Sequence, residues 1–435
     1  MATLQPYKKY NAIAYDYETQ LPDGWQLLPN IAVFQERIER GHINEELLSV
    51  TIGRGVIRQT EVDIKKDSSN EDKSKYKLIK VGDIAYNKMR MWQGALGYSD
   101  YQGISSPAYV ILKPKMKINP RYFHYMFRTS FYTNYSKRFS YGIVDDQLSL
   151  RYTDFKRMYS IVPPIEVQNR IVAYLDEKNN EIDKFIRNKE RLIELLEEEK
   201  INAFERLTRI GENEGAVLKF SGINWIGNIN QDWEIRKVSH SFKKIGSGTT
   251  PTSGANEYYD NGIYPWVNTG DLNDSILSTV NTLITKKALK DYSTLKQYPK
   301  GTLLIAMYGA TIGKASIMHI EACTNQACCA LVPYKYFDTE FLFYWFKGNR
   351  NKIIALSYGG GQPNISQDVI RALRIPCPKI DEQKQLVKQI LFEENRLNLI
   401  ISKAKQEINS IKEYREALIT DLVTGKRSVP QLQMR

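Results

Sequence analysis

Cysteine is scarce in this sequence. The four cysteines, Cys323, Cys328, Cys329 and Cys377, all lie in its second half; two are adjacent and none forms a Cys-x-x-Cys pair. This spacing excludes a disulfide framework and a zinc ribbon. Because disulfides are rare in reducing compartments, we expect a cytoplasmic protein.

Long apolar runs are also missing. No stretch approaches the roughly 18 apolar residues of a membrane span. The first residues, 1–15, contain no hydrophobic core of a signal peptide. The sequence therefore predicts a soluble protein without a membrane partner.

Patterns that carry catalysis are absent as well. The four histidines are isolated, with no His or Cys at metal-ligand spacing, so no metal site is expected. Segment 309–315 resembles a phosphate-binding loop, but it has three residues between its glycines instead of four and ends on Ala315, which lacks a hydroxyl for magnesium. No glycine fingerprint for a methyl donor follows a strand, and the nuclease-like triplet at 63–65 has no counterpart in the second half. We predict no catalytic residue and no cofactor on this chain.

What the sequence does have is length and positive charge. Its 435 residues include 61 Lys and Arg against 49 Asp and Glu, a net charge of +12. The length predicts two or three domains. The charge favours a nucleic-acid partner, although many proteins carry such an excess only to stay dispersed.

The sequence is also internally repeated. A shift of 219 residues superimposes Gly82 on Gly301, Gly94 on Gly313, and the aromatic run 122–127 on 341–346. Each half reads as a mixed region followed by a long helix with apolar residues at heptad spacing. We therefore predict an α+β protein with two mixed α/β recognition domains, at 1–164 and 211–379, and two long antiparallel helices forming a coiled coil, at 165–210 and 380–427, before a tail at 428–435.

The two helices are predicted to pair through their heptad positions a and d, where polar residues such as Asn179 and Glu394 interrupt the pattern and could set the register. The alternative is two separate amphipathic helices, each covering its own domain. The residues predicted to pair are Leu175, Ile182, Ile186, Ile193, Leu196, Ile390, Leu397, Ile401, Ile408 and Ile411.

Several motifs resemble the specificity subunit of type I restriction-modification systems. They are SGTTP at 247–251, YPWVNTGDL at 264–272, IDEQ at 380–383, REALITDLVTGK at 415–426 and, in the first half, YKLIKVGDIAYNKMR at 76–90. The resemblance implies a non-catalytic subunit whose two domains each read one part of a split, asymmetric double-stranded DNA site. It also implies helices that dock methyltransferase subunits, two of them by expectation, alongside restriction subunits. S-adenosylmethionine, ATP and Mg are then expected on those partners. A helix of about 45 residues is roughly 65 Å long, so the pair would act as a ruler between the two recognition domains.

DNA contacts need Lys or Arg for phosphates, and Arg, Asn or Gln for base edges. Beside glycine turns in the first domain we predict Arg54, Arg58, Asn87, Lys88, Arg90 and Tyr141. In the second domain we predict Thr250, Asn268, Tyr308, Thr311, Lys314, Tyr358 and Gln362. At each position the alternative is a solvated or capping residue.

Two other functions compete with DNA recognition: a fused DNA methyltransferase, and a coiled-coil scaffold with two protein-binding heads. The missing methyl-donor fingerprint disfavours the first. Charge favours DNA over the second, because residues 1–165 carry +7 and residues 211–380 carry +5, while the two helical segments together carry −1.

Overall fold

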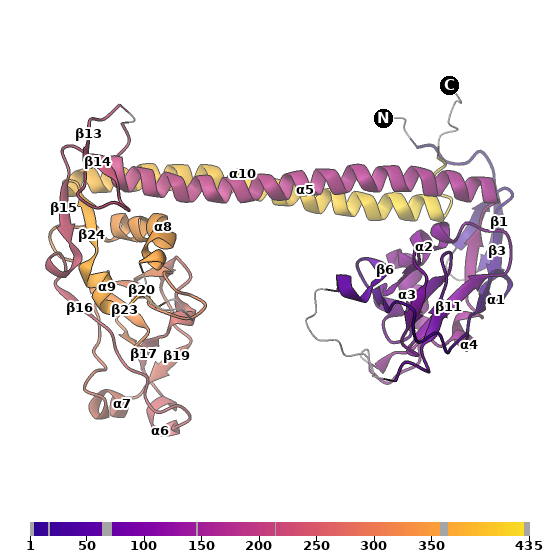
Figure 1. The fold of residues 1–435 in the computed structure, drawn as a ribbon, viewed down its shortest axis with the longest axis horizontal. Coiled ribbons are helices and arrows are strands. Elements are labelled where there is room, and N and C mark those ends of the chain that lie inside the picture. Colours follow the sequence, from indigo (N-terminus) through magenta and orange to yellow (C-terminus); the bar gives the residue numbers. More distant parts are fainter. Residues whose placement is uncertain are drawn as a thin grey trace. The chain divides into compact units, whose positions relative to one another are not determined.

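The structure is a computed structural model that describes residues 4–15, 18–62, 72–144, 147–213, 215–356 and 364–429. The chain forms two compact units. Unit 1 combines residues up to 188 with those from 406 onward, and unit 2 comprises residues 189–405. The unit boundaries fall inside the two long helices, so each unit contains part of both (Figure 1).

Unit 1 is built on an antiparallel sheet whose strand order is β4 (Phe34–Glu36), β11 (Tyr109–Pro114), β8 (Ile84–Asn87) and β9 (Leu96–Tyr98). Helix α2 (Pro120–Arg128) packs beside β9. It begins at Asn119, whose side chain accepts a hydrogen bond from the N–H of Arg121, and Thr129 separates it from α3 (Ser130–Phe139). Smaller antiparallel pairs complete the unit: β1 (Tyr10–Tyr15) with β2 (Glu18–Pro22), β3 (Gln26–Pro29) with β12 (Tyr159–Val162), β5 (Leu48–Thr51) with β6 (Gly55–Arg58), and β7 (Lys77–Ile79) with β10 (Gly103–Ser105).

Unit 2 repeats this plan. Its main sheet has the order β16 (Lys244–Gly246), β23 (Cys328–Val332), β20 (Leu303–Ala306), β21 (Ala315–Met318) and β18 (Ile276–Leu277). Strands β8 and β20 coincide under the 219-residue shift, and β9 and β11 begin at the residues that the shift maps onto the starts of β21 and β23. The aromatic run of the second half lies in α8 (Thr339–Ala355). The predicted α+β duplication is confirmed.

Unit 2 also has parts outside this shared sheet. A second sheet has the order β19 (Thr282–Ile284), β17 (Tyr264–Val267) and β22 (Cys323–Thr324), next to the short helices α6 (Asn256–Tyr259) and α7 (Lys286–Asp291). Two further antiparallel pairs are β13 (Leu218–Phe220) with β14 (Asn228–Asn230), and β15 (Glu234–Lys237) with β24 (Arg374–Cys377).

The long helices α5 (Ile165–Ile210) and α10 (Ile380–Val423) lie side by side and run antiparallel (Figure 1). In unit 2, Leu196 clusters with Leu397 and Ile401, while the Lys200 ammonium reaches Asn398 at 3.0 Å. In unit 1, Arg415 of α10 pairs with Asp183 of α5. Of the predicted pairing residues, Ile186, Ile193 and Ile411 are half-buried and the other seven are buried, and most residues between them are exposed. The apolar seam therefore follows the heptads.

Two polar residues that interrupt the seam form hydrogen bonds to the sheet domains. In unit 1, Asn179 donates a 3.2 Å hydrogen bond to the hydroxyl of Tyr125, which itself donates to Asp176. In unit 2, the hydroxyl of Tyr344 donates to Glu394 at 2.8 Å. Tyr125 and Tyr344 occupy the same position in the repeat. Burial raises the pKa of both phenols, so they remain donors at neutral pH.

Segments near the two ends of the chain are hydrogen-bonded to each other in unit 1. The N–H of Ser428 donates to the carbonyl oxygen of Gln5 at 2.7 Å. The hydroxyl of Tyr10 donates to the carbonyl oxygen of Gly425 at 3.0 Å, and that of Tyr122 donates to the carbonyl oxygen of Val423 at 2.8 Å. Residues near both ends of the sequence thus form hydrogen bonds with one another in unit 1.

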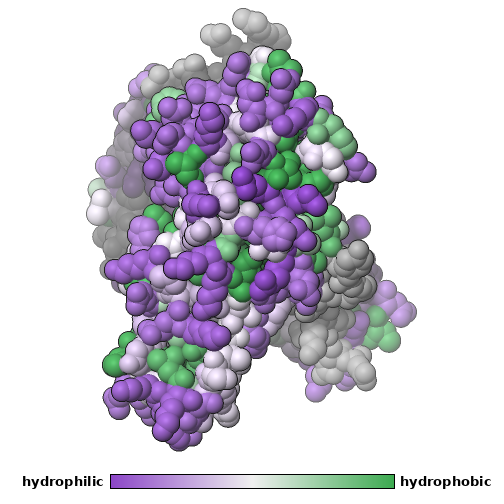
Figure 2. Space-filling model, turned by 90° about the vertical axis from the view of Figure 1, so that its left-hand side faces the viewer, coloured by the Kyte–Doolittle hydropathy of each residue, from purple (hydrophilic) through white to green (hydrophobic). Residues whose placement is uncertain are grey.

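One face of the molecule is polar over much of its extent (Figure 2). Figure 2 shows a face that is largely hydrophilic, with hydrophobic residues in small, separate patches. Among helices of the described residues, none has the combined length and apolarity that a membrane crossing requires.

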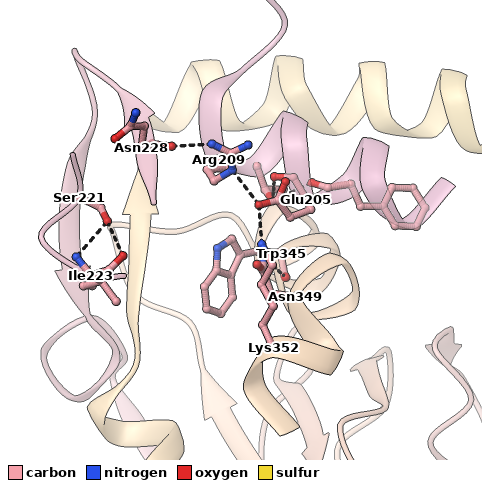
Figure 3. Close-up of polar contacts among 10 residues, drawn as sticks. Glu205, Arg209, Ser221, Ile223, Asn228, Trp345, Asn349 and Lys352 are labelled. Carbon is pink, nitrogen blue, oxygen red and sulfur yellow. Dashed lines mark hydrogen bonds and ion pairs between the residues drawn. The ribbon is translucent and has the colours of Figure 1, made fainter. Parts of the chain in front are cut away.

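In unit 2 the end of α5 is fastened to the sheet domain by a polar cluster (Figure 3). The Glu205 carboxylate accepts from Arg209 at 2.7 Å and from Lys352 of α8 at 2.9 Å. Arg209 also donates to the carbonyl oxygen of Asn228 in β14 at 2.6 Å. Between the helices lies Gly348, where an added Cβ would stand 2.6 Å from the backbone nitrogen of Glu205. Only glycine allows the two helices to approach this closely.

Gly348→Ala should destabilise unit 2 by about 1–3 kcal/mol, because backbone must move to admit the methyl group. Thermal unfolding followed by calorimetry measures the change. The matched control is Gly53→Ala, where a Cβ would meet nothing within 4 Å. Equal melting temperatures for the two variants would show that α5 and α8 do not pack this closely.

Candidate nucleic-acid interface

The loop that joins β8 to β9 in unit 1 brings three predicted DNA contacts together. Asn87 ends β8, and its side-chain oxygen accepts from the N–H of Met89 at 2.9 Å. Arg90 is exposed, whereas Lys88 is half-buried, and desolvation by burial, with the nearby charge of Lys77, lowers the pKa of Lys88. Asn87 and Arg90 line a cavity of about 510 Å³ whose wall includes Tyr109.

Two more predicted contacts lie on the hairpin of β5 and β6, and strand β5 of this hairpin lines the cavity. Arg54 is paired with Glu61. Arg58 lies 3.4 Å from Glu46 and stacks over the ring of Tyr101 at 5.0 Å. Because exposed ion pairs contribute about 0–1 kcal/mol, a phosphate could displace either carboxylate at little cost.

Tyr141 forms an isolated antiparallel bridge with Ser149 near the same loop. Its side chain is 78% exposed. Its backbone pairs with Ser149, and the N–H of the next residue, Leu150, donates to the carbonyl oxygen of Lys88 at 2.9 Å. The neighbouring Ile143 is 92% exposed and was missed by sequence reasoning, although an apolar residue beside a turn glycine was a usable signal.

In unit 2 the equivalent loop joins β20 to β21 and carries Tyr308, Thr311 and Lys314. Gly309 and Gly313 shape it with φ values of +81° and +73°, a region that favours glycine. Tyr308 is exposed, and the other two side chains are half-buried. The N–H of Lys314 donates to the carbonyl oxygen of Thr311 at 2.9 Å, so these two residues close a turn.

Thr250 and Asn268 lie around a neighbouring turn. The hydroxyl of Thr250 donates to the side-chain oxygen of Gln326 at 2.7 Å. The side-chain oxygen of Asn268 instead accepts from the N–H of Gly270 at 2.7 Å and caps the short 3-10 helix Thr269–Asp271. Its oxygen is therefore used within the fold. The predicted residues Tyr358 and Gln362 lie outside the described residues.

The two regions of unit 2 meet through backbone hydrogen bonds. The N–H of Met307 donates to the carbonyl oxygen of Ala327 at 2.8 Å. This bond places Tyr308 beside the turn that contains Asn325 and Gln326, which sequence reasoning missed. Asn325 and Ser106 hold the same repeat position, and each side-chain oxygen accepts from the backbone N–H two residues later. That correspondence was the available signal.

No catalytic residue was predicted, and the buried cysteines are poorly suited to act as nucleophiles. Burial raises the pKa of Cys323 to about 11 and that of Cys329 to about 12. Thiols with such values are protonated at neutral pH and are poor nucleophiles. Within the described ranges, no group of three or more His, Cys, Asp or Glu side chains could hold a metal ion.

Known proteins share this architecture. One solved structure, from work on complex assembly and conformational transition of the type I R-M system, superposes with a TM-score of 0.70 at 16% identity, covering 93% of this chain and 99% of that one. The HsdS subunit from Thermoanaerobacter tengcongensis superposes with a TM-score of 0.54 at 17% identity, covering 93% and 98%. The fold is thus that of type I specificity subunits.

Sequence comparisons point to the same group of proteins as the structural comparisons. Residues 230–410 match the family model described as the Type I restriction modification DNA specificity domain. The putative type I restriction enzyme MjaX specificity subunit of Methanocaldococcus jannaschii is 26% identical over 97% of this chain and 98% of its own length. The EcoR124I/EcoR124II specificity subunit of Escherichia coli is 24% identical over 32% of this chain and 36% of its own length. The chain is therefore similar, in sequence and in fold, to the specificity subunits of type I restriction-modification systems.

His124 supports the loops of unit 1 from α2. Its Nδ1 accepts from the N–H of Tyr98 at 3.1 Å, and its ring lies near Gly55, where an added Cβ would be 3.4 Å from Cε1. Desolvation by burial, together with the nearby charges of Arg128 and Arg121, lowers its pKa from 6.5 to about 3. The imidazole is therefore neutral, as an acceptor from a backbone N–H must be.

Unit 1 should lose stability as the pH falls below 6.5. In this range His124 becomes protonated in the unfolded chain, whereas in the folded protein it stays neutral down to about pH 3. At pH 5 the loss is up to about 2 kcal/mol. His124→Asn keeps an acceptor oxygen without titrating. The measurement is the difference in unfolding free energy between wild type and variant from pH 7 to 5. A constant difference would mean that folded His124 takes up protons as readily as the unfolded chain does.

Proposed function

We propose that this chain is the DNA-recognition subunit of a type I restriction-modification complex, acting in the cytoplasm. Each unit reads one part of a two-part double-stranded site. The observation that carries the proposal is the equivalent placement, in both units, of a loop with cationic and polar side chains: residues 88–95 between β8 and β9, and residues 307–314 between β20 and β21. The subunit is not itself an enzyme. S-adenosylmethionine, ATP and Mg belong to its partners.

Charge supports this division of labour. Residues 1–165 and 211–380 carry +7 and +5, while the helical segments carry −1. Cations near DNA displace condensed counterions from phosphates and supply affinity, while base edges are read by amide and guanidinium groups. The loops and the residues next to them offer both kinds of group: Arg90 with Asn87, the last residue of β8, in unit 1, and Lys314 with Gln326, in the turn between β22 and β23, in unit 2.

The exposed surface of α10 is better suited to bind a protein than to bind DNA. Phe392 and Leu399 of α10 are 62% and 58% exposed. They stand seven residues apart at heptad position f, which faces away from the seam and is ordinarily polar. Leu391 and Ile400 add partly exposed apolar surface beside them. We propose that a methyltransferase subunit covers this apolar strip of residues 391–400.

The decisive test of DNA recognition is methylome sequencing of cells with and without this chain. One split motif should lose its methylation when the chain is deleted and regain it on complementation. Unchanged methylation in a host that retains the partner subunits would reject the proposal. The motif recovered in this way defines the duplex for binding experiments.

Arg90→Ala and Lys314→Ala should each weaken binding to that duplex. If either side chain contacts a phosphate, the slope of log affinity against log salt should fall by about 0.9, the value for one lost phosphate contact. Glu321→Gln, an exposed carboxylate of unit 2, is the control and removes no cation. Unchanged affinity and slope in the arginine and lysine variants would count against these two assignments.

Replacing both Phe392 and Leu399 with Glu should abolish co-purification with the methyltransferase subunit, since a partner would have to bury two carboxylates. The melting temperature should not change, because both side chains are exposed. The control keeps the apolar surface, as Phe392→Leu with Leu399→Ile. Retention of the partner by the Glu variant would place the docking surface elsewhere.

A further inference from the structure

In unit 1, one arginine holds the backbone of two segments that carry predicted DNA contacts. Arg128, the last residue of α2, donates to the carbonyl oxygen of Leu96 at 2.9 Å. Its other terminal nitrogen donates to the carbonyl oxygens of Ile52 at 2.9 Å and Gly53 at 2.6 Å. Desolvation by burial lowers its pKa. The guanidinium therefore joins the start of β9 to the turn that carries Arg54.

The segments that Arg128 joins are in close contact. A Cβ on Gly97 would stand 2.8 Å from the Cα of Gly55, so β6 and β9 touch backbone to backbone. The Thr51 hydroxyl shapes the turn by donating to the carbonyl oxygen of Gly55 at 3.1 Å and accepting from the N–H of Arg54 at 3.2 Å. Three backbone carbonyl oxygens thus accept from the guanidinium of Arg128, which has five N–H donors.

In unit 2, Arg350 of α8 also joins two segments, through one backbone carbonyl oxygen and one carboxylate. Its Nε donates to the carbonyl oxygen of Gly313 at 3.1 Å, and Nη2 is bonded to Asp274. The same oxygen of Asp274 accepts from the N–H of Ala315, the first residue of β21, at 3.0 Å. Asp274 itself has a φ of +56°, an uncommon conformation for a residue other than glycine.

The fit around Gly313 is tight. A Cβ there would lie 2.8 Å from Cγ of Arg350 and 3.3 Å from Cδ1 of Ile354. The end of the loop that carries Tyr308, Thr311 and Lys314 is thus pressed against α8 and tied to the residues preceding β18. Arg350 therefore fixes the end of this loop, where the chain re-enters the sheet at β21.

The two arginines act at equivalent places in the repeat. Leu96 and Ala315 are related by the 219-residue shift. In unit 1, Arg128 of α2 joins the start of β9 to the turn between β5 and β6. In unit 2, Arg350 of α8 joins the end of the loop before β21 to Asp274. Under the shift, Arg128 superimposes on Lys347, three residues before Arg350. Residues three apart lie on one helix face, so Arg350 reaches the same end of the loop from a different position, bonding to Gly313 and Asp274 and not to the first residue of the strand.

We propose that Arg128 and Arg350 are positioning residues for DNA readout, one in each unit. This inference rests on the proposed function. Fixing one residue of a mobile loop costs about 1–2 kcal/mol, and a loop held in place before binding avoids that cost. The arginines then govern discrimination at their own half-site without contacting DNA.

The test uses the full-length subunit and the duplex identified by methylome sequencing. Arg350→Lys keeps the charge but cannot hold two acceptors in the same geometry, and Asp274→Asn perturbs the same contact from its other side. Discrimination between the intact duplex and one with the unit 2 half-site scrambled should fall about tenfold, as expected if one loop residue must be ordered on binding. Arg128→Lys should do the same for the other half-site. The controls are Asn351→Ala and Ser130→Ala, which are exposed neighbours.

The salt dependence separates positioning from contact. The slope of log affinity against log salt should stay at the wild-type value in the Lys variants and also in Arg350→Ala, because no phosphate contact is lost. A slope lower by about 0.9 in Arg350→Ala would mean a direct phosphate contact and would overturn the inference. So would undiminished discrimination, or equal loss at both half-sites. If the wild type itself fails to discriminate, it is the proposed function that fails.

Discussion

The antiparallel seam of α5 and α10 is the interaction on which both units depend. The core of unit 1 contains Val172 and Leu175 from the start of α5 with Leu418 and Leu422 from the end of α10. The core of unit 2 contains Phe204 and Leu207 from the end of α5 with residues from the start of α10, including Ile390. Each core therefore contains residues of both helices, so pairing of the helices and burial of each core stabilise one another.

The polar residues along the seam take part in this coupling. A seam of only apolar residues would allow the helices to slide past one another. Lys200 of α5 bonds to Asn398 of α10, and Arg415 of α10 pairs with Asp183 of α5, so these pairs hold the two helices in register. Asn179 and Glu394 act differently: each bonds to a tyrosine of its own unit, Tyr125 or Tyr344, and so joins a long helix to the sheet domain of that unit.

Most of the fold was predictable from the sequence, and most of the interface was not. Glycine and aromatic spacing located the repeat, and heptads located the helices, because both patterns depend on local periodicity. The partners of individual polar residues depend on tertiary contacts instead. Arg58 faces Glu46 and Tyr101, and the oxygen of Asn268 caps a 3-10 helix. Arg128 and Arg350 gave no signal, since they bond mainly to backbone carbonyls and a carboxylate brought close only by folding.

The hydrogen bonds between residues near the two chain ends have a consequence for synthesis. Unit 1 needs Leu418, Leu422 and Val423 for its core, and Ser428 to bond Gln5. Leu418, Leu422, Val423 and Ser428 are all translated after residue 405, the last residue of unit 2. The unit that begins the chain is therefore the last to receive its complete set of residues on the ribosome. Until α10 emerges, the apolar face of α5 that it will cover has no partner.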